Sequence, residues 1–152
     1  MTEVFESTIE EELLKNGSFA ICAKGESMRP MLRGGKDMVI IAKRPLEIRK
    51  YDVILFKDKR QRYVLHRVVK VKDGFYLTRG DNTYFEEHVD EECVLGILTR
   101  YNKDGKSYDV NSFSSKLYAR QRVFFYPVRK LLLKIRKRLS CLYRKFFKKR
   151  QK

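Results

Sequence analysis

The first residues carry an apolar stripe at helical spacing. Its members recur on one face of a helix over about residues 3–15 and are Val4, Phe5, Ile9, Leu13 and Leu14. Thr2 or Ser7 can cap the start of this helix, Ser7 together with Glu10 as a capping box. Asn16-Gly17 predicts its end.

From Ser18 to about Val110 the pattern changes to short runs rich in β-branched and aromatic residues. The runs are Phe19–Ala23, Met38–Ala42, Val53–Phe56, Tyr63–Val71, Phe75–Thr78 and Val94–Arg100. Asp73-Gly74 between two runs predicts a hairpin, and Asp104-Gly105 predicts a second one over about residues 97–110. Because no helical pattern intervenes, we expect a mainly β fold, a compact barrel or folded sheet.

After Ser115 the spacing becomes helical again. One stripe comprises Leu131, Ile135, Leu139, Leu142 and Phe146, and it is widened by Leu132, Tyr143 and Phe147. Pro127 is expected to separate residues 115–126 from this later helix. The chain is thus predicted to contain an N-terminal helix (1–17), a β-domain (18–114) and a basic amphipathic helical tail (115–152).

Charge distinguishes the tail from the rest of the chain. The net charge is +16, but residues 1–115 hold 20 Lys and Arg against 19 Asp and Glu, whereas residues 116–152 hold 15 basic residues and no acid. A basic helix with a wide apolar stripe favours an anionic membrane surface. The residues predicted to bind it are Arg129, Lys130, Lys134, Arg136, Lys137, Arg138, Arg144 and Lys145. Nucleic acid is the alternative partner. A third possibility requires no partner: the helix packs on the body of the protein and its basic face is solvated.

Length and composition restrict the class of protein. A chain of 152 residues, 43% hydrophobic and 36% charged, suits one soluble domain with an appendage. Cys22, Cys93 and Cys141 are far apart and odd in number, so neither a disulfide framework nor a zinc site is implied. With five glutamates among residues 1–12 and no run of 18 apolar residues, we expect no signal peptide and no transmembrane helix. The expected location is cytoplasmic, peripheral on the inner membrane face, and no cofactor or metal is expected.

Three residues in chain order offer the chemistry of nucleophilic catalysis. Ser27 follows a predicted strand, in a turn bounded by Gly25 and Pro30; His66 lies mid-strand among valines; Asp81 follows the strand that pairs with that of His66. A histidine can take the proton of a serine hydroxyl if a third group fixes its tautomer. Burial among valines would lower the pKa of His66 and keep it neutral as a base. Residue types alone also fit a turn serine and a core histidine.

The flanking residues resemble those of the type I signal peptidase superfamily, which includes the self-cleaving repressor peptidases. The matching segments, in order, are Ser27-Met28-Arg29-Pro30, Asp52-Val53-Ile54-Leu55-Phe56, Tyr63-Val64-Leu65-His66-Arg67-Val68-Val69, Leu77-Thr78-Arg79-Gly80-Asp81-Asn82 and Val94-Leu95-Gly96. They cover about half the chain and look closest to the archaeal and endoplasmic-reticulum branch, in which histidine is the base. The resemblance implies a signal-peptidase-like folded β-sheet or barrel.

The same resemblance implies a serine endopeptidase. Ser27 would be the nucleophile and supply one oxyanion donor through its backbone N–H, His66 the base, and Asp81 the group that holds the imidazole; Met28 and Pro30 would contact a signal- or leader-like peptide. The chain differs in having Glu26 where many members have glycine, and a short acidic helix in place of a membrane anchor. The alternative is a catalytically silent peptide- or membrane-binding module on the same fold. A self-cleaving repressor is disfavoured because the first 17 residues are too short for a helix-turn-helix domain.

Overall fold

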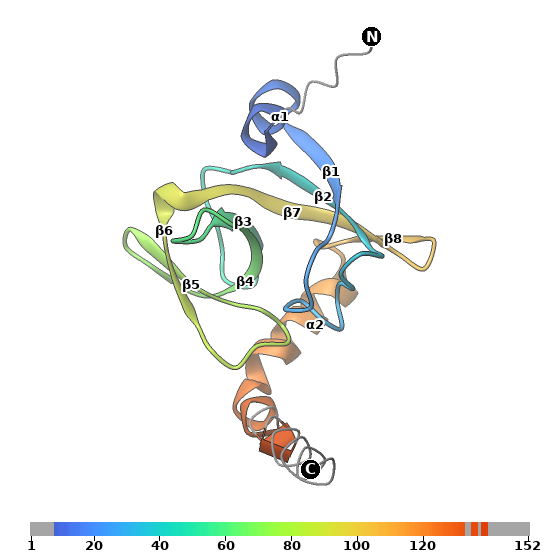
Figure 1. Ribbon diagram of the computed structural model, residues 1–152, viewed down its shortest axis with the longest axis vertical. Helices are drawn as coiled ribbons and strands as arrows, with labels where there is room; N and C mark the ends of the chain where they lie inside the picture. Colours follow the sequence, from blue (N-terminus) through green and yellow to red (C-terminus); the bar gives the residue numbers. More distant parts are fainter. Residues whose placement is uncertain (1–7, 133–134, 137, 140–152) are drawn as a thin grey trace, which may run out of the picture.

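The structure is a computed structural model that describes residues 8–132, 135–136 and 138–139. It is mainly β: eight antiparallel strands form one curled sheet in the order β1-β2-β7-β3-β4-β5-β6, with β8 paired to β7 (Figure 1). The elements are α1 (Ile9–Asn16), β1 (Ser18–Cys22), β2 (Met38–Lys43), β3 (Val53–Lys57), β4 (Tyr63–Lys72), β5 (Phe75–Arg79), β6 (Glu87–Asp90), η1 (Glu91–Cys93), β7 (Val94–Lys103), β8 (Lys106–Asp109) and α2 (Phe113–Phe124).

Helix α1 closes one end of the sheet. Thr8 caps it, forming a capping box with Glu11, and Gly17 ends it in the left-handed conformation. Leu13 is buried in the core, whereas Leu14 is exposed. The predicted end at Asn16-Gly17 is confirmed, but the helix begins at Ile9 after an extended Thr8, so the expected continuous helix from near residue 3 and the Ser7–Glu10 capping box are wrong. Thr2 and Ser7 themselves lie outside the described residues.

The sheet encloses two hydrophobic clusters because strand β3 buries both of its faces. Val53 and Leu55 belong to the cluster under α1 and β1, and Ile54 and Phe56 to a second cluster with Val68. This double burial explains why residues 53–56 form an unbroken apolar run rather than an alternating one. All six predicted strands are present, and β6 lies in a segment for which the sequence predicted no strand.

The long strand β7 joins the two halves of the sheet. It pairs with β2 along one edge and, along the other, with β3 and then β8. The predicted hairpin at Asp104-Gly105 is confirmed, since both residues have positive φ, as a tight two-residue turn requires.

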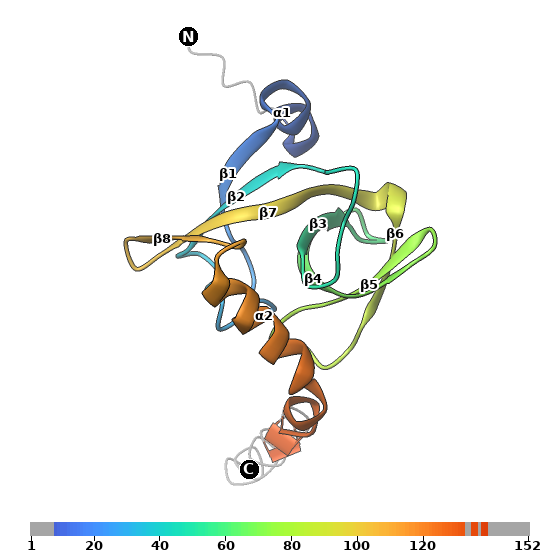
Figure 2. The same ribbon diagram turned by 180° about the vertical axis from the view of Figure 1, so that it is seen from behind.

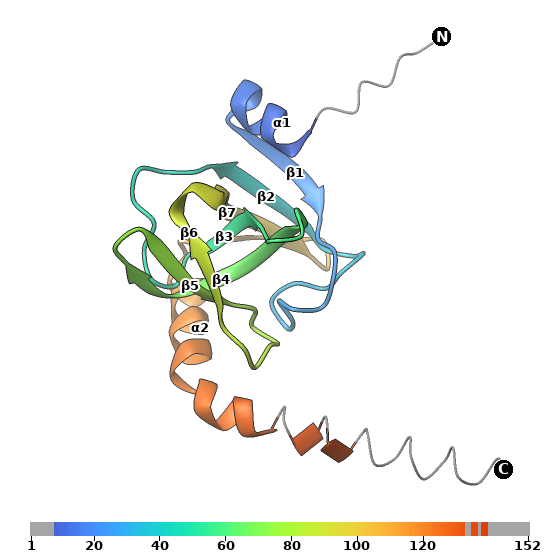
Figure 3. The same ribbon diagram turned by 60° about the vertical axis from the view of Figure 1, so that its left-hand side comes forward.

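Helix α2 lies at the end of the sheet opposite α1, and the chain continues from it away from the strands (Figures 2 and 3). Ser112 caps it, and it ends at Phe124, shortly before Pro127; residues 126–132 are again helical. This agrees with the predicted break near Pro127. In the described part of the chain, no helix combines the length and the apolar character needed to cross a membrane.

Candidate functional site

Ser27 lies in the tight turn that follows β1. Its side chain is half-buried, and the next residue, Met28, is buried in the first cluster and anchors the turn. Among the described residues, the Ser27 N–H has no hydrogen-bond acceptor, which leaves it free to bind an oxyanion. Glu26, the unusual neighbour of Ser27, forms an ion pair with Arg29 at the surface.

His66 is buried in the middle of β4, opposite Ile54 of β3. Only 4% of the residue is exposed, and the ring of Phe56 meets the imidazole edge-on with centroids 6.1 Å apart. Burial lowers the pKa of His66, while the negative charges of Glu87 and then Asp81 raise it; the net direction is down. The imidazole is therefore neutral near pH 7, as a general base must be.

The carboxylate that faces the imidazole is that of Glu87, on β6. Glu87 Oε2 lies 2.7 Å from His66 Nδ1. Both atoms are buried, and neither has a hydrogen-bond partner elsewhere in the described residues. At this separation a small rotation of the carboxylate aligns it with an Nδ1 proton. A proton held at Nδ1 leaves Nε2 free to accept one.

Gly80 borders both Ser27 and His66. A Cβ placed on Gly80 would lie 3.0 Å from His66 Nε2, 3.0 Å from Ser27 Cβ and 2.6 Å from the Ser27 carbonyl oxygen. Ser27 Cβ and His66 Nε2 therefore lie no more than 6.0 Å apart, the sum of these two distances. Within the described chain, Ser27 Oγ makes no hydrogen bond to His66.

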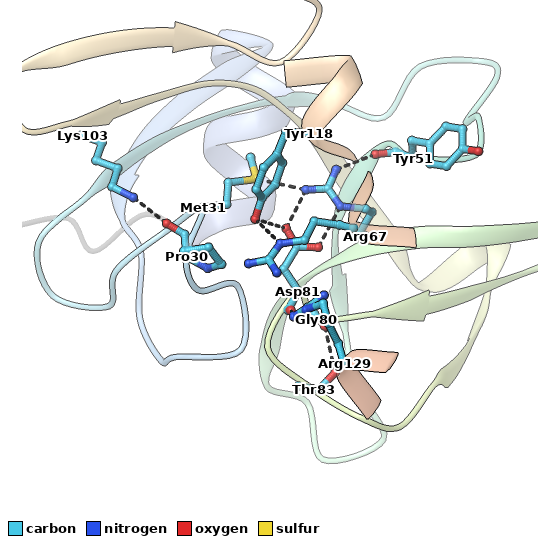
Figure 4. Close-up of polar contacts among 11 residues, drawn as sticks. Pro30, Met31, Tyr51, Arg67, Gly80, Asp81, Thr83, Lys103, Tyr118 and Arg129 are labelled. Carbon is cyan, nitrogen blue, oxygen red and sulfur yellow. Dashed lines mark hydrogen bonds and ion pairs between the residues drawn. The ribbon is translucent and has the colours of Figure 1, made fainter. Parts of the chain in front are cut away.

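Asp81 occupies a different position from the one predicted. Its buried carboxylate binds Arg67, with Nε 2.9 Å from Oδ1 and Nη2 2.8 Å from Oδ2, and accepts a 3.1 Å hydrogen bond from Tyr118 (Figure 4). The expectation that Asp81 holds the imidazole is corrected to this extent: Asp81 influences His66 only through its charge, and Glu87 makes the contact. The physical reason is that Arg67 points away from His66 on the same strand and draws Asp81 with it.

A cavity of about 890 Å³ begins beside Ser27. Its wall is mainly apolar and comes from α1, β1, β2, β3 and the first residues of β4; the contributing side chains include Phe19, Ile21, Val39, Ile41 and Leu55. Met28 lines it, and its predicted contact with a substrate stays a prediction. Pro30 does not line the cavity and is exposed, with its carbonyl bound by Lys103. Cys22 is half-buried in the same wall.

The basic tail is described only in part. Arg129, predicted to bind a membrane, instead donates a hydrogen bond to the Asp81 carbonyl, and Lys130 lies over the ring of Tyr126. Arg136 and Arg138 are exposed. The other predicted membrane residues, Lys134, Lys137, Arg144 and Lys145, lie outside the described residues, as do Cys141 and the last part of the apolar stripe.

Sequence analysis missed Glu87, Arg67 and Tyr118 as residues of the site. The register offers a signal for Glu87: it lies opposite Thr78, which lies opposite Val68, so it belongs to the row of the sheet adjacent to His66. Within the described residues, no group of His, Cys, Asp and Glu side chains is arranged to hold a metal ion. Comparison with models of known families matches none, and comparison with curated proteins finds no relative.

Proposed function

We propose that the protein is a serine peptidase of signal-peptidase-like fold, with Ser27 as nucleophile, His66 as general base and Glu87 as the carboxylate that orients the base. The observation that carries the proposal is that Ser27 Cβ and His66 Nε2 would each lie 3.0 Å from a Cβ on Gly80, while Ser27 itself lines an apolar cavity. The order of the motifs around Ser27, His66 and Asp81 supports it.

The chemistry follows from these positions. As Ser27 Oγ attacks the scissile carbonyl, its proton passes to His66 Nε2, and the Ser27 N–H stabilises the oxyanion. Collapse of the tetrahedral intermediate transfers that proton to the departing amine and leaves an acyl-enzyme. Water, deprotonated by His66, then releases the acid and restores the serine. Glu87 stabilises the imidazolium formed in each half-reaction.

The cavity favours an extended peptide with apolar side chains near the scissile bond. Its lining is apolar, and a signal- or leader-like segment carries such side chains. β1 is the terminal strand of the sheet and lines the cavity, so its unpaired edge is available to an extended chain.

The test is covalent labelling with a serine-reactive fluorophosphonate. Wild-type protein should be acylated at Ser27, located by peptide mass spectrometry, whereas Ser27→Ala and His66→Ala should lose labelling by at least about a hundredfold. Two matched controls, Ser107→Ala on β8 and His88→Ala on β6, should label like wild type, since both residues are exposed and away from Gly80. Equal labelling of all five proteins would refute catalysis and favour the silent peptide-binding module.

We further propose an anionic membrane as the partner of the tail. Large apolar side chains are exposed along the described part of α2 and the segment after it, namely Phe113, Leu117, Phe124, Phe125, Val128, Leu131, Leu132, Ile135 and Leu139. The absence of acidic residues after Asp109 gives this surface a single charge sign. Apolar side chains can enter a bilayer, whereas a nucleic-acid backbone offers them no apolar interior.

Vesicle sedimentation tests this partner. Binding to phosphatidylserine-containing vesicles should exceed binding to phosphatidylcholine vesicles and should fall with salt. The variant Phe124→Ser/Leu131→Ser/Leu132→Ser should lose most of the binding. Leu46→Ser, which alters a fully exposed leucine in the loop before β3, should not. If the triple variant binds as wild type does, the membrane assignment is wrong.

A further inference from the structure

Helix α2 contacts the same loop that meets the catalytic candidates. Tyr118 donates its hydroxyl to Asp81 Oδ2 at 3.1 Å, and Arg67 lies over the Tyr118 ring at 5.7 Å (Figure 4). The pKa of Tyr118 is raised to about 12, first by burial and then by the charge of Asp81, so the hydroxyl remains a donor throughout the neutral range. The Asp81 carboxylate is thus bound by Arg67 from strand β4 and by Tyr118 from helix α2.

A second set of contacts is made by Tyr126 and Arg129, eight and eleven residues after Tyr118. Arg129 donates to the Asp81 carbonyl, and the Tyr126 hydroxyl donates to the Tyr84 carbonyl at 2.8 Å. The Arg79 guanidinium lies 3.2 Å from the centre of the Tyr126 ring. Both ends of the loop, residues 80–84, are therefore attached to one helical segment.

The opposite side of the loop is attached to the turn that carries the serine. The Asn82 N–H donates to the Ser27 carbonyl at 2.6 Å, and the Asn82 side chain donates to the Glu26 carbonyl at 3.1 Å. Gly80 borders both Ser27 and His66 so closely that a side chain on it would meet both residues. A displacement of this loop therefore moves the Ser27 backbone and alters the space between Ser27 and His66.

We propose that Tyr118 and Tyr126 are positioning residues of the catalytic site, through which the C-terminal helical segment holds loop 80–84 against the Ser27 turn. The proposal rests on the proposed peptidase function for its catalytic consequence, but the attachment itself is independent of it. The sheet alone does not fix the loop, because β5 ends at Arg79 and β6 begins at Glu87. In this arrangement, a partner that binds the C-terminal helical segment would also change the position of loop 80–84. The reactivity of Ser27 would change with it.

The experiment compares Tyr118→Phe/Tyr126→Phe with wild type and with Tyr108→Phe. The double variant removes two hydroxyl donors but keeps both rings under Arg67 and Arg79, so folding is preserved. The control makes the same conservative change at Tyr108 on β8, whose ring stacks on that of Tyr101. Amide hydrogen exchange of residues 80–84 and 26–28 reports the attachment, and the rate of fluorophosphonate acylation reports its consequence.

We expect exchange in both segments to accelerate in the double variant alone, and acylation to slow by about ten- to a hundredfold, because small misplacements of reacting groups have large effects on rate. Unchanged exchange would refute the attachment, whether or not the protein is a peptidase. Faster exchange with an acylation rate within about twofold of wild type would refute the positioning role. Failure of Ser27→Ala to abolish labelling would instead refute the proposed function, so the two failures are distinguishable.

Discussion

Replacing Gly80 with alanine tests the geometry of the site most directly. The backbone of Gly80 does not have the positive φ that disfavours alanine, so the added methyl group acts only through contacts. It would lie 2.6 Å from the Ser27 carbonyl oxygen and 3.0 Å from both Ser27 Cβ and His66 Nε2. All three separations are shorter than ordinary van der Waals contact, so the loop, the serine turn or the imidazole must move.

The size of the effect follows from which atoms are crowded. The nearest atom belongs to backbone already held by the Asn82 N–H at 2.6 Å, so relief by rotation of a side chain is not available there. Overpacking of this kind costs about 1–3 kcal/mol of unfolding free energy. A shift approaching 1 Å between nucleophile and base lowers the rate by about a hundredfold. We therefore expect a folded protein with modestly reduced stability and a severe loss of acylation.

The assay is the pseudo-first-order rate of fluorophosphonate labelling, measured beside urea denaturation. Gly105→Ala is the matched control, because the hairpin glycine has positive φ but open space around it. Its cost of about 1–2 kcal/mol comes from backbone strain alone, so it should lose stability without losing acylation. A Gly80→Ala protein that labels within about twofold of wild type would show that Gly80 does not border both the nucleophile and the base, and the proposed site would be wrong.

Three further changes have defined outcomes. Glu87→Gln should slow acylation at neutral pH by about tenfold or more and shift the pH–rate profile to lower pH, because the Glu87 charge raises the pKa of His66; Glu92→Gln, on the exposed η1, should do neither. Asp81→Asn should cost about 3–5 kcal/mol in urea denaturation, since it leaves the buried Arg67 guanidinium without its charge partner, and Arg67→Met combined with it should cost less than the sum of the single changes. Burial lowers the pKa of His66 below its ordinary value of 6.5, so the unfolded chain binds the proton more readily; stability should fall as the pH drops through 6.5 toward the lower folded pKa, and His66→Gln should remove that part of the decline between about pH 7.5 and pH 5.

The sequence predicts the strands well because their signals are local. Apolar runs and Asp-Gly turns depend on neighbouring residues, and the hairpin at Asp73-Gly74 also gives the register near its turn. Counting from the turn alone would set Asp81 opposite His66, but a bulge between Val68 and Lys70 shifts the register by one residue and brings Gly80 beside His66 instead. Strand β6 escapes prediction because it buries a single side chain, Val89, and its charged neighbours resemble those of a loop. Its formation depends on the edge of β5 rather than on its own residues.

The roles of the two carboxylates illustrate where sequence reasoning ends. Asp81 and Glu87 both follow His66 on neighbouring segments of the sheet. As carboxylates they could each either orient the imidazole or serve a purely structural role, and the residue type does not distinguish the two. The structure separates them by their partners: Arg67 and Tyr118 bind the Asp81 carboxylate, whereas the Glu87 carboxylate faces the imidazole and has no hydrogen-bond donor elsewhere in the described part of the chain. Tyr118 lies 37 residues from Asp81, in a segment that sequence analysis assigned to a membrane-binding tail. A motif can thus contain a residue required for the site while the neighbours that decide its role lie in another part of the chain.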